Sequence, residues 1–145
     1  MVLKTVAGAR TGEDVDDLRD WLLALAGGPE VTDVVVLACD RHDEPATWTY
    51  VEADARAGVA RRRCLACAHT TPLLDSDARW THPPMWMCGG CGHSIAEVAA
   101  GLAVPDGEHV EWVALAGRCV ECGRLSGLTD AVVARRPLAE VRARL

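Results

Sequence analysis

The residues of this sequence with the most specific chemistry are seven cysteines and one histidine that is spaced like the second member of a cysteine pair. Three Cys-x-x-Cys pairs occur, and a fourth turn has His in place of the second Cys; in order they are Cys39/His42, Cys64/Cys67, Cys88/Cys91 and Cys119/Cys122. A Cys-x-x-Cys turn lets two thiolates converge on one metal ion, and two such turns complete a tetrahedral set of ligands. The spacing therefore predicts that these eight residues bind metal.

The rest of the sequence favours metal binding over disulfide formation. The N-terminal stretch lacks the apolar core of a secretory signal, and no apolar run approaches the roughly 20 residues that cross a bilayer. We therefore expect a cytoplasmic protein with no membrane partner, and in that compartment paired cysteines are more often metal ligands or catalytic thiols than disulfides. An odd number of cysteines, seven, also suits a disulfide framework poorly. A redox dithiol explains one pair but not three.

Residues 57–101 resemble a zinc-ribbon or treble-clef zinc module, with Cys64/Cys67 as the first knuckle and Cys88/Cys91 as the second. Glycines surround Cys91 where a tight turn needs them. The capping box Ser94-Ile-Ala-Glu97 predicts a helix to about Gly101, which favours the treble-clef variant. The resemblance implies one structural zinc held by four thiolates. Iron is chemically compatible with the same donors, but the second knuckle lacks the Pro common in rubredoxin-like sites.

Two arrangements of a second site are open. If the central two pairs share one metal, Cys39/His42 and Cys119/Cys122 remain to form a Cys₃His site. A sequential scheme, in which the first turn joins the second and the third joins the fourth, fits the spacings almost as well. The alternative without a second metal makes Cys39 a small core residue and His42 a solvated loop residue. We expect one zinc ion and favour two.

Hydrophobic patterns predict an α+β fold in a small, metal-stabilised domain. Residues 2–38 indicate a β-α-β unit, whose helix has Val15, Leu18, Leu22 and Leu25 on one face and stops at Gly27-Gly28. The patterns after this unit predict a hairpin, a strand near residues 109–117, a strand and turn after the third Cys pair, and a C-terminal helix that opens at Pro137. The predicted organisation is an N-terminal unit at 1–56, a zinc-ribbon-like module at 57–104 and a C-terminal segment at 105–145, together one compact domain.

Catalysis is not expected. His109-x-Glu111 followed by Cys119/Cys122 is similar to the ligand pattern of zinc nucleobase deaminases, but no Pro precedes Cys119 and only a short strand separates the two parts. Four-thiolate sites are closed, whereas a catalytic zinc keeps an open position. His69 and His93 each follow a knuckle by two residues, and we interpret them as neighbours that donate hydrogen bonds rather than as ligands.

The sequence favours a protein-binding, adaptor or regulatory module with structural zinc. One alternative is a nucleic-acid-binding zinc ribbon of transcription or translation, although the net charge of −6 disfavours phosphate binding. The other alternative is a thiol-redox or metal-sensing protein. Two candidate contact surfaces are the Trp80–Trp86 loop, which could equally cover a small core, and Arg61 to Arg63, which could equally guard an edge strand. The oligomeric state stays open.

Overall fold

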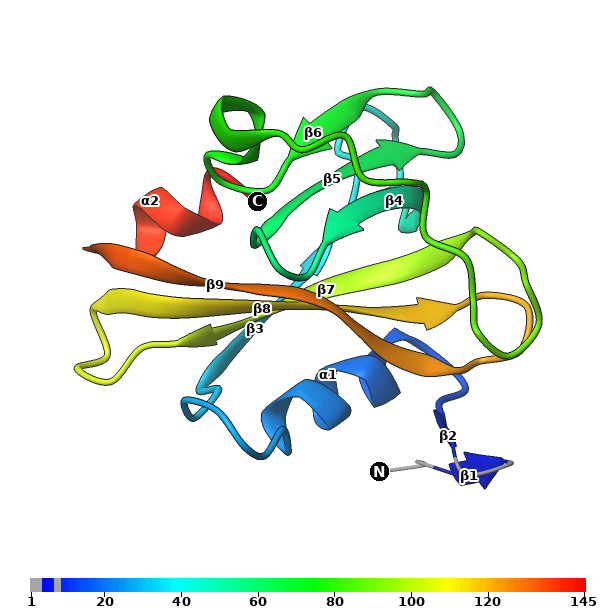
Figure 1. Ribbon diagram of the computed structural model, residues 1–145, viewed down its shortest axis with the longest axis horizontal. Coiled ribbons are helices and arrows are strands. Elements are labelled where there is room, and N and C mark those ends of the chain that lie inside the picture. Colours follow the sequence, from blue (N-terminus) through cyan, green and yellow to red (C-terminus); the bar gives the residue numbers. More distant parts are fainter. Residues whose placement is uncertain (1–3, 7–8) are drawn as a thin grey trace.

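The computed structural model describes residues 4–6 and 9–145, and it consists mostly of antiparallel sheet with two α-helices (Figure 1). No helix in these ranges is both long and apolar enough to cross a membrane. The strands are β1 (Lys4–Val6), β2 (Ala9–Thr11), β3 (Asp33–Leu37), β4 (Trp48–Asp54), β5 (Val59–Cys64), β6 (Thr70–Pro72), β7 (Ala96–Ala103), β8 (His109–Cys119) and β9 (Leu125–Pro137). The helices are α1 (Val15–Leu23) and α2 (Leu138–Arg142), with a 3-10 helix at Ser76–Arg79.

Each half of the chain contributes three consecutive antiparallel strands to the main sheet. In the first half β4, β5 and β6 pair as antiparallel neighbours, and in the second half β7, β8 and β9 do the same. The halves join where the start of β4 pairs with the start of β7, at Trp48↔Glu97 and Thr49↔Ala96. Strand β3 pairs with the rest of β7, so the seven-stranded order is β6-β5-β4-β7-β8-β9 with β3 beside β7.

The sheet curls until the turn between β4 and β5 reaches β9. A Cβ atom at Gly58 would lie 2.9 Å from the backbone oxygen of Asp130, so only glycine fits this close approach. Next to it, the hydroxyl of Thr129 donates a hydrogen bond to the backbone oxygen of Asp54 at 3.0 Å. The curled sheet encloses the larger apolar core, which is closed by Val141 of α2 and by the last residue, Leu145. The predicted C-terminal helix is confirmed, and it begins directly after Pro137.

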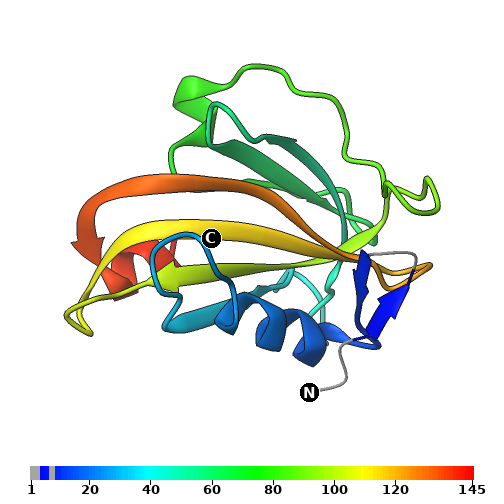
Figure 2. The same cartoon turned by 60° about the horizontal axis from the view of Figure 1, so that its bottom comes forward.

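The opposite face of the sheet is covered by α1, which lies along β3, β7 and β8 (Figure 2). Asp14 caps the helix by accepting the N–H of Asp17 at 3.1 Å. Leu18 and Leu22 are buried as predicted and pack against Trp112 and small residues of β7 and β8. The helix ends at Leu23, earlier than the predicted Gly27-Gly28 stop.

The predicted N-terminal β-α-β unit is wrong. The chain reverses after β1, which pairs antiparallel with β2 in a separate two-stranded sheet. The strand on the other side of α1, β3, pairs antiparallel with β7 instead. Local patterns found a strand, a helix and a strand, but strand partners are chosen by contacts far along the chain. Residues 2, 3, 7 and 8 of the predicted first strand lie outside the described residues.

The predicted helix after the second Cys pair is also wrong, because residues 96–103 form β7. This run of small apolar residues is buried almost throughout, with strands pairing on both of its edges. Glu97 does not close a capping box with Ser94. Its carboxylate instead accepts hydrogen bonds from Arg118 and from the hydroxyl of Thr47, each at 3.0 Å. Central sheet pairing therefore overrides the local helix signal.

The remaining strand predictions agree with the structure. The predicted hairpin is β4 and β5, and the predicted strand near residues 109–117 is β8. After the third Cys pair the structure has one long strand, β9, where the sequence predicted a strand and a turn. This strand shifts register against β8 in two places, which lets it bend without a break.

Candidate metal centres

The eight predicted ligands come together in two groups of four. Cys39 and His42, which follow β3, meet Cys64 and Cys67 from the turn between β5 and β6; Cys88 and Cys91, which precede β7, meet Cys119 and Cys122 from the turn between β8 and β9. The ligand atoms of each group all lie within 4.8 Å of one another. The pairing of the two central turns is therefore wrong, and the sequential scheme is the one that the fold brings together.

Distances within both groups fit a tetrahedral metal ion. Zinc–sulfur bonds of about 2.3 Å place two thiolates of one tetrahedron roughly 3.8 Å apart. The observed Sγ···Sγ distances are 3.8 Å for Cys39 and Cys67, 3.6 Å for Cys88 and Cys122, and 3.5 Å for Cys91 and Cys119. All seven cysteines are free thiols. The geometry is consistent with a zinc-binding module.

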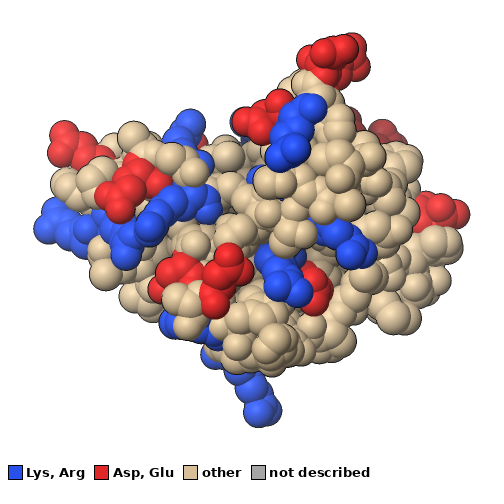
Figure 3. All heavy atoms as spheres, turned by 90° about the horizontal axis from the view of Figure 1, so that it is seen from above, with Lys and Arg blue, Asp and Glu red and all other residues tan. Residues whose placement is uncertain are grey.

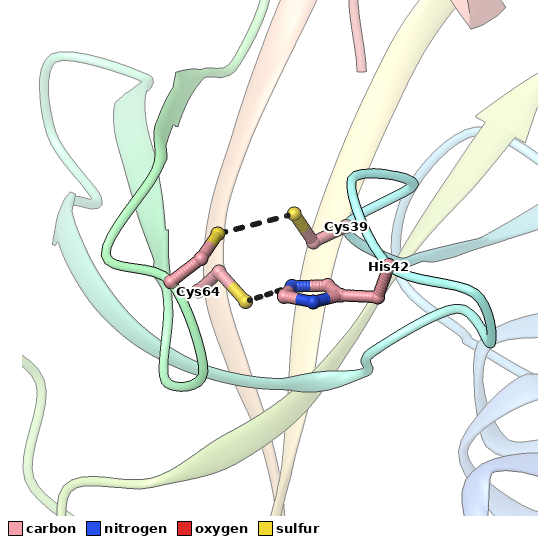
Figure 4. Close-up of side chains that lie close together, drawn as sticks. Cys39, His42 and Cys64 are labelled. Atoms are coloured by element: carbon pink, nitrogen blue, oxygen red, sulfur yellow. Dashed lines mark hydrogen bonds between the residues drawn. The ribbon is translucent and has the colours of Figure 1, made fainter.

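The group that contains His42 takes its four side chains from two segments that face each other. In Figure 4, Cys39 and His42 point from the loop after β3 toward Cys64 on the opposite turn. The Nε2 atom of His42 lies 3.4 Å from the Sγ of Cys64. A zinc ion with its imidazole nitrogen at about 2.0–2.1 Å spans a gap of this size.

The three Cys-x-x-Cys turns share one backbone conformation. In each turn the N–H of the first Cys donates to the carbonyl five residues later: Cys64 to His69, Cys88 to His93 and Cys119 to Arg124, at 2.8–2.9 Å. The carbonyl of the first Cys accepts from the residue after the second Cys, namely Ala68, Gly92 and Gly123. These three residues have positive φ angles of 62°, 79° and 77°. The first turn thus has alanine where the left-handed region favours glycine.

The turn at Cys39 is built differently. Cys39 exchanges two backbone hydrogen bonds with Ala46, at 2.8 and 3.1 Å, which closes a wider loop around His42. The first ligand of every turn is buried, whereas the second is exposed or half-buried. Each ion would therefore lie between a strand end and the solvent, because Cys64 is the last residue of β5 and Cys119 the last residue of β8.

Backbone amides lower the pKa of one thiol in each group. Burial opposes ionisation of Cys64, but the N–H groups of Cys67 and Ala66 and the ring of His42 lower its pKa to about 6. At Cys88 burial is again opposed by amides, those of Cys91 and Gly90, and the pKa falls to about 7. Burial raises the pKa of Cys119 and Cys122. One thiolate per group is thus prepared for a cation, and a bound metal would stabilise the others as thiolates.

An arginine lies close to each group. Arg62 is half-buried, its charge is felt at Cys39 and Cys64, and its Nη2 donates to the backbone oxygen of Leu145 at 2.9 Å. Near the second group, Arg118 pairs with Glu97 and donates to the backbone oxygens of Gly12 and Glu13. Arg118 thereby ties the segment before α1 to the end of β8 that leads into the Cys119 turn. The sequence did not single out Arg118, because nothing local to it indicates a remote partner.

The arginine strand is not an edge strand, which corrects one predicted alternative. Arg61 to Arg63 lie on β5, with β4 on one side and β6 on the other. The side chains alternate along β5: Arg62 turns inward, while Arg61 pairs with Glu52 at 3.0 Å and stacks on Trp80 at 4.2 Å. Arg63 lies over the ring of Tyr50 at 5.2 Å. These side chains are mostly engaged within the protein and do not form a free basic stripe.

The contacts of the remaining histidines and of Trp86 show what these side chains do. The Nδ1 of His93 lies 3.3 Å from the Sγ of Cys91, while the Nδ1 of His69 faces Arg41 at 3.4 Å. His109 contacts Asp106 rather than a cysteine. The side chain of Trp86 packs against the larger core, and the backbone N–H of Trp86 donates to the backbone oxygen of Val51 at 2.7 Å. At Trp86 the loop therefore covers the core.

Comparisons of the chain with known protein families, with curated proteins and with solved structures found no match. Functional inference therefore rests on the two groups of ligands and on the surfaces around them.

Proposed function

We propose that each group of four ligands holds one zinc ion and that both ions are structural. The observation that carries this proposal is the set of sulfur–sulfur distances, 3.5–3.8 Å, which matches the edge of a tetrahedral zinc site. Each group supplies four protein ligands, so no position is left for a reacting water. The ions would clamp the loop ends of the sheet and take no part in catalysis.

The metal assignment is tested by native mass spectrometry of the chain purified under reducing conditions. Two bound zinc ions are expected. A mass with one metal would remove one group from the proposal, and iron in place of zinc would change the metal. A folded chain without metal would contradict the proposal as a whole.

We further propose that the zinc-stabilised chain is a protein-binding module, acting as an adaptor or regulator. Four large apolar side chains are exposed near the metal groups: Trp48, Leu65, Met85 and Met87. We call these four residues the apolar face. Trp48 is 51% and Met87 62% exposed. The apolar face supports contact with another protein, because exposed apolar patches on small proteins mark interaction sites.

Strand pairing places part of the apolar face on one side of the sheet. Thr49 pairs with Cys64, so the preceding Trp48 lies opposite Leu65, whose N–H donates to its backbone oxygen at 3.1 Å. Met85 bridges to Glu52, which shares its side of β4 with Trp48 because side chains alternate along a strand. The arginines beside this face are engaged with Glu52, Trp80 and Tyr50, which favours a protein partner over a phosphate backbone.

The binding role is tested by affinity capture from the source cell. Zinc-loaded wild-type chain, a Trp48→Ser/Met87→Ser variant and a Leu23→Ser control serve as baits; Leu23 is exposed but lies on α1, outside the apolar face. A protein retained by the wild type and control but lost by the double variant is the expected result. Identical captures by all three baits would contradict it. Salt-sensitive capture of nucleic acid would favour the alternative of a nucleic-acid-binding protein.

The thiol-redox alternative is tested on the same preparation. Cys67, Cys91 and Cys122 are exposed, so a thiol reagent can reach them if no metal protects them. Slow alkylation of the metal-loaded chain supports a structural role for the thiols. Rapid, stoichiometric alkylation with zinc still bound would favour a redox or sensing function.

A further inference from the structure

A groove runs along β9 at the end of the sheet away from the metal groups. Its volume is about 390 Å³. One wall is β9 from Asp130 to Ala134. The other wall is formed by the turn between β4 and β5, by Leu73 to Asp75 and by side chains from the 3-10 helix and the C-terminal segment. Because β4 runs from the metal end toward this turn, the groove and the metal groups lie at opposite ends of the hairpin.

The groove runs along β9 where the strand is irregular. Ala131, Val132, Val133 and Ala134 all line the groove in succession. The pairing with β8 jumps within this stretch, from Trp112↔Val132 to Val110↔Arg136, so side chains do not alternate regularly there. In the described part of the chain β9 pairs with β8 alone, so its other edge is open. Val132 at this edge is 87% exposed.

The groove is positively charged in an otherwise acidic protein. Four arginines and two aspartates line it: Arg56, Arg79, Arg136 and Arg144, with Asp75 and Asp130. Arg79 pairs with Asp75 and Arg136 with Glu140. Asp130 accepts a hydrogen bond from the indole N–H of Trp112 at 2.9 Å. Figure 3 shows charged side chains of both signs over the end of the molecule with α2 and the 3-10 helix, and few over the opposite end.

Two of these arginines form no salt bridge among the described residues, although the charge of Arg56 helps to lower the pKa of Asp54. Arg56 and Arg144 form no ion pair there. The acid nearest to Arg56 in sequence, Asp54, already accepts the hydroxyl of Thr81 and the backbone N–H groups of Arg56 and Ala57. Both arginines are exposed, so their charges are available to a ligand in the groove.

We propose that this groove binds an extended, acidic segment of a partner protein, which adds to the open edge of β9 as a further strand. The backbone of β9 supplies hydrogen bonds to the added strand, and the arginines of the opposite wall select for carboxylates. The inference rests on the proposed protein-binding function and names its class of partner. The same features have a second interpretation, in which charges and the register shift near Trp112 only guard the edge against unwanted pairing.

A peptide library separates the two interpretations. Random twelve-residue peptides displayed on phage are selected on the zinc-loaded full chain, and enriched sequences are synthesised with a fluorophore for anisotropy titrations. Enriched peptides are expected to alternate Asp or Glu with β-branched residues. Their affinity should fall at least tenfold for Arg56→Glu/Arg144→Glu, and at least tenfold when alternate peptide nitrogens are methylated. Arg19→Glu on α1 is the matched control and should leave affinity unchanged.

Amide hydrogen exchange gives a second readout that locates the peptide. Bound peptide should slow exchange in residues 131–134, the stretch that supplies the open edge. No enrichment, enrichment of basic peptides, or affinity that is insensitive to the double arginine variant would overturn the proposal in favour of a guarded edge. Affinity lost with Trp48→Ser instead would move the binding site to the apolar face. Zinc content is measured first, so a zinc-loaded chain without peptide binding contradicts this inference and leaves the metal assignment standing.

Discussion

Ala68 is the residue of the three Cys-x-x-Cys turns whose replacement should stabilise the protein. Its φ of 62° lies in the left-handed region, where the equivalent residues of the other two turns are Gly92 and Gly123. An L-residue pays roughly 1–2 kcal/mol for this conformation. Replacing it with glycine adds about 0.4–1 kcal/mol of chain entropy to the unfolded state. The balance predicts that Ala68→Gly stabilises the folded chain by about 0.5–1 kcal/mol.

Thermal unfolding of the zinc-loaded chain measures this effect. For a chain of this size, about 1 kcal/mol moves the Tm by roughly 2–4 °C, so Ala68→Gly should raise it by about 1–4 °C. Reverse substitutions in the other turns serve as controls. Gly92→Ala has open space around the new Cβ and should cost only the backbone strain. Gly123→Ala should cost more, because its Cβ would lie 2.6 Å from the backbone oxygen of Gly12.

The order of the three variants is the critical result. A lower Tm for Ala68→Gly would show that the first turn is not strained by its alanine. Equal losses for Gly92→Ala and Gly123→Ala would show that the close approach to Gly12 is relieved at no cost. Either outcome would refute the reasoning from backbone conformation, provided that native mass spectrometry finds the same metal content in all variants.

The remaining predictions concern the metal groups, the core and an acidic turn. Cys39→Ser should lose one of two zinc ions and Cys91→Ser the other, each visible by native mass spectrometry, and the double variant should lose both. Leu22→Ala, at a side chain only 1% exposed, should destabilise the chain by about 2–5 kcal/mol in denaturant unfolding. The pKa of Asp106 is held well below its usual range by Arg135 and by backbone amides, so its carboxylate stabilises the fold above pH ~4 and less as the pH falls further. Asp106→Asn should therefore be less stable than the wild type at neutral pH and lose less stability on acidification, and parallel pH profiles would contradict this.

Local spacing was enough to single out the eight residues that the fold gathers into two groups, but not to predict which turns meet. A Cys-x-x-Cys turn is a local structure, so its two thiolates can be read from the sequence. Which two turns meet depends on the pairing of β4 with β5 and of β7 with β8, over tens of residues. The prediction joined the central pairs because both have the most familiar pattern. The fold instead brings together the turn that precedes the first strand of a hairpin and the turn that follows its second strand. The two hairpins are β4–β5 and β7–β8.

The error at Ser94 has a related cause. Ser94 and Glu97 form a valid helix-start pattern, and alanine-rich sequence has high helix propensity. Glu97 is needed elsewhere, however, as the partner of Arg118 and Thr47. Residues as small as those of β7 also suit a strand that packs against α1 on one face and the curled sheet on the other. No window of local sequence contains these partners.

The sequential grouping of ligands has a consequence for how the chain folds. A metal ion in the first group would close a loop from Cys39 to Cys64, 64 − 39 = 25 residues apart, and one in the second group would close a loop from Cys88 to Cys119, 119 − 88 = 31 residues apart. The other arrangement would have joined Cys39 to Cys119, 119 − 39 = 80 residues apart. Closing 80 residues rather than 25 costs about 1 kcal/mol more in chain entropy. With metal present, each half of the chain would bind its own ion between residues that are close in sequence, and the two ladder pairs between β4 and β7 would form afterwards.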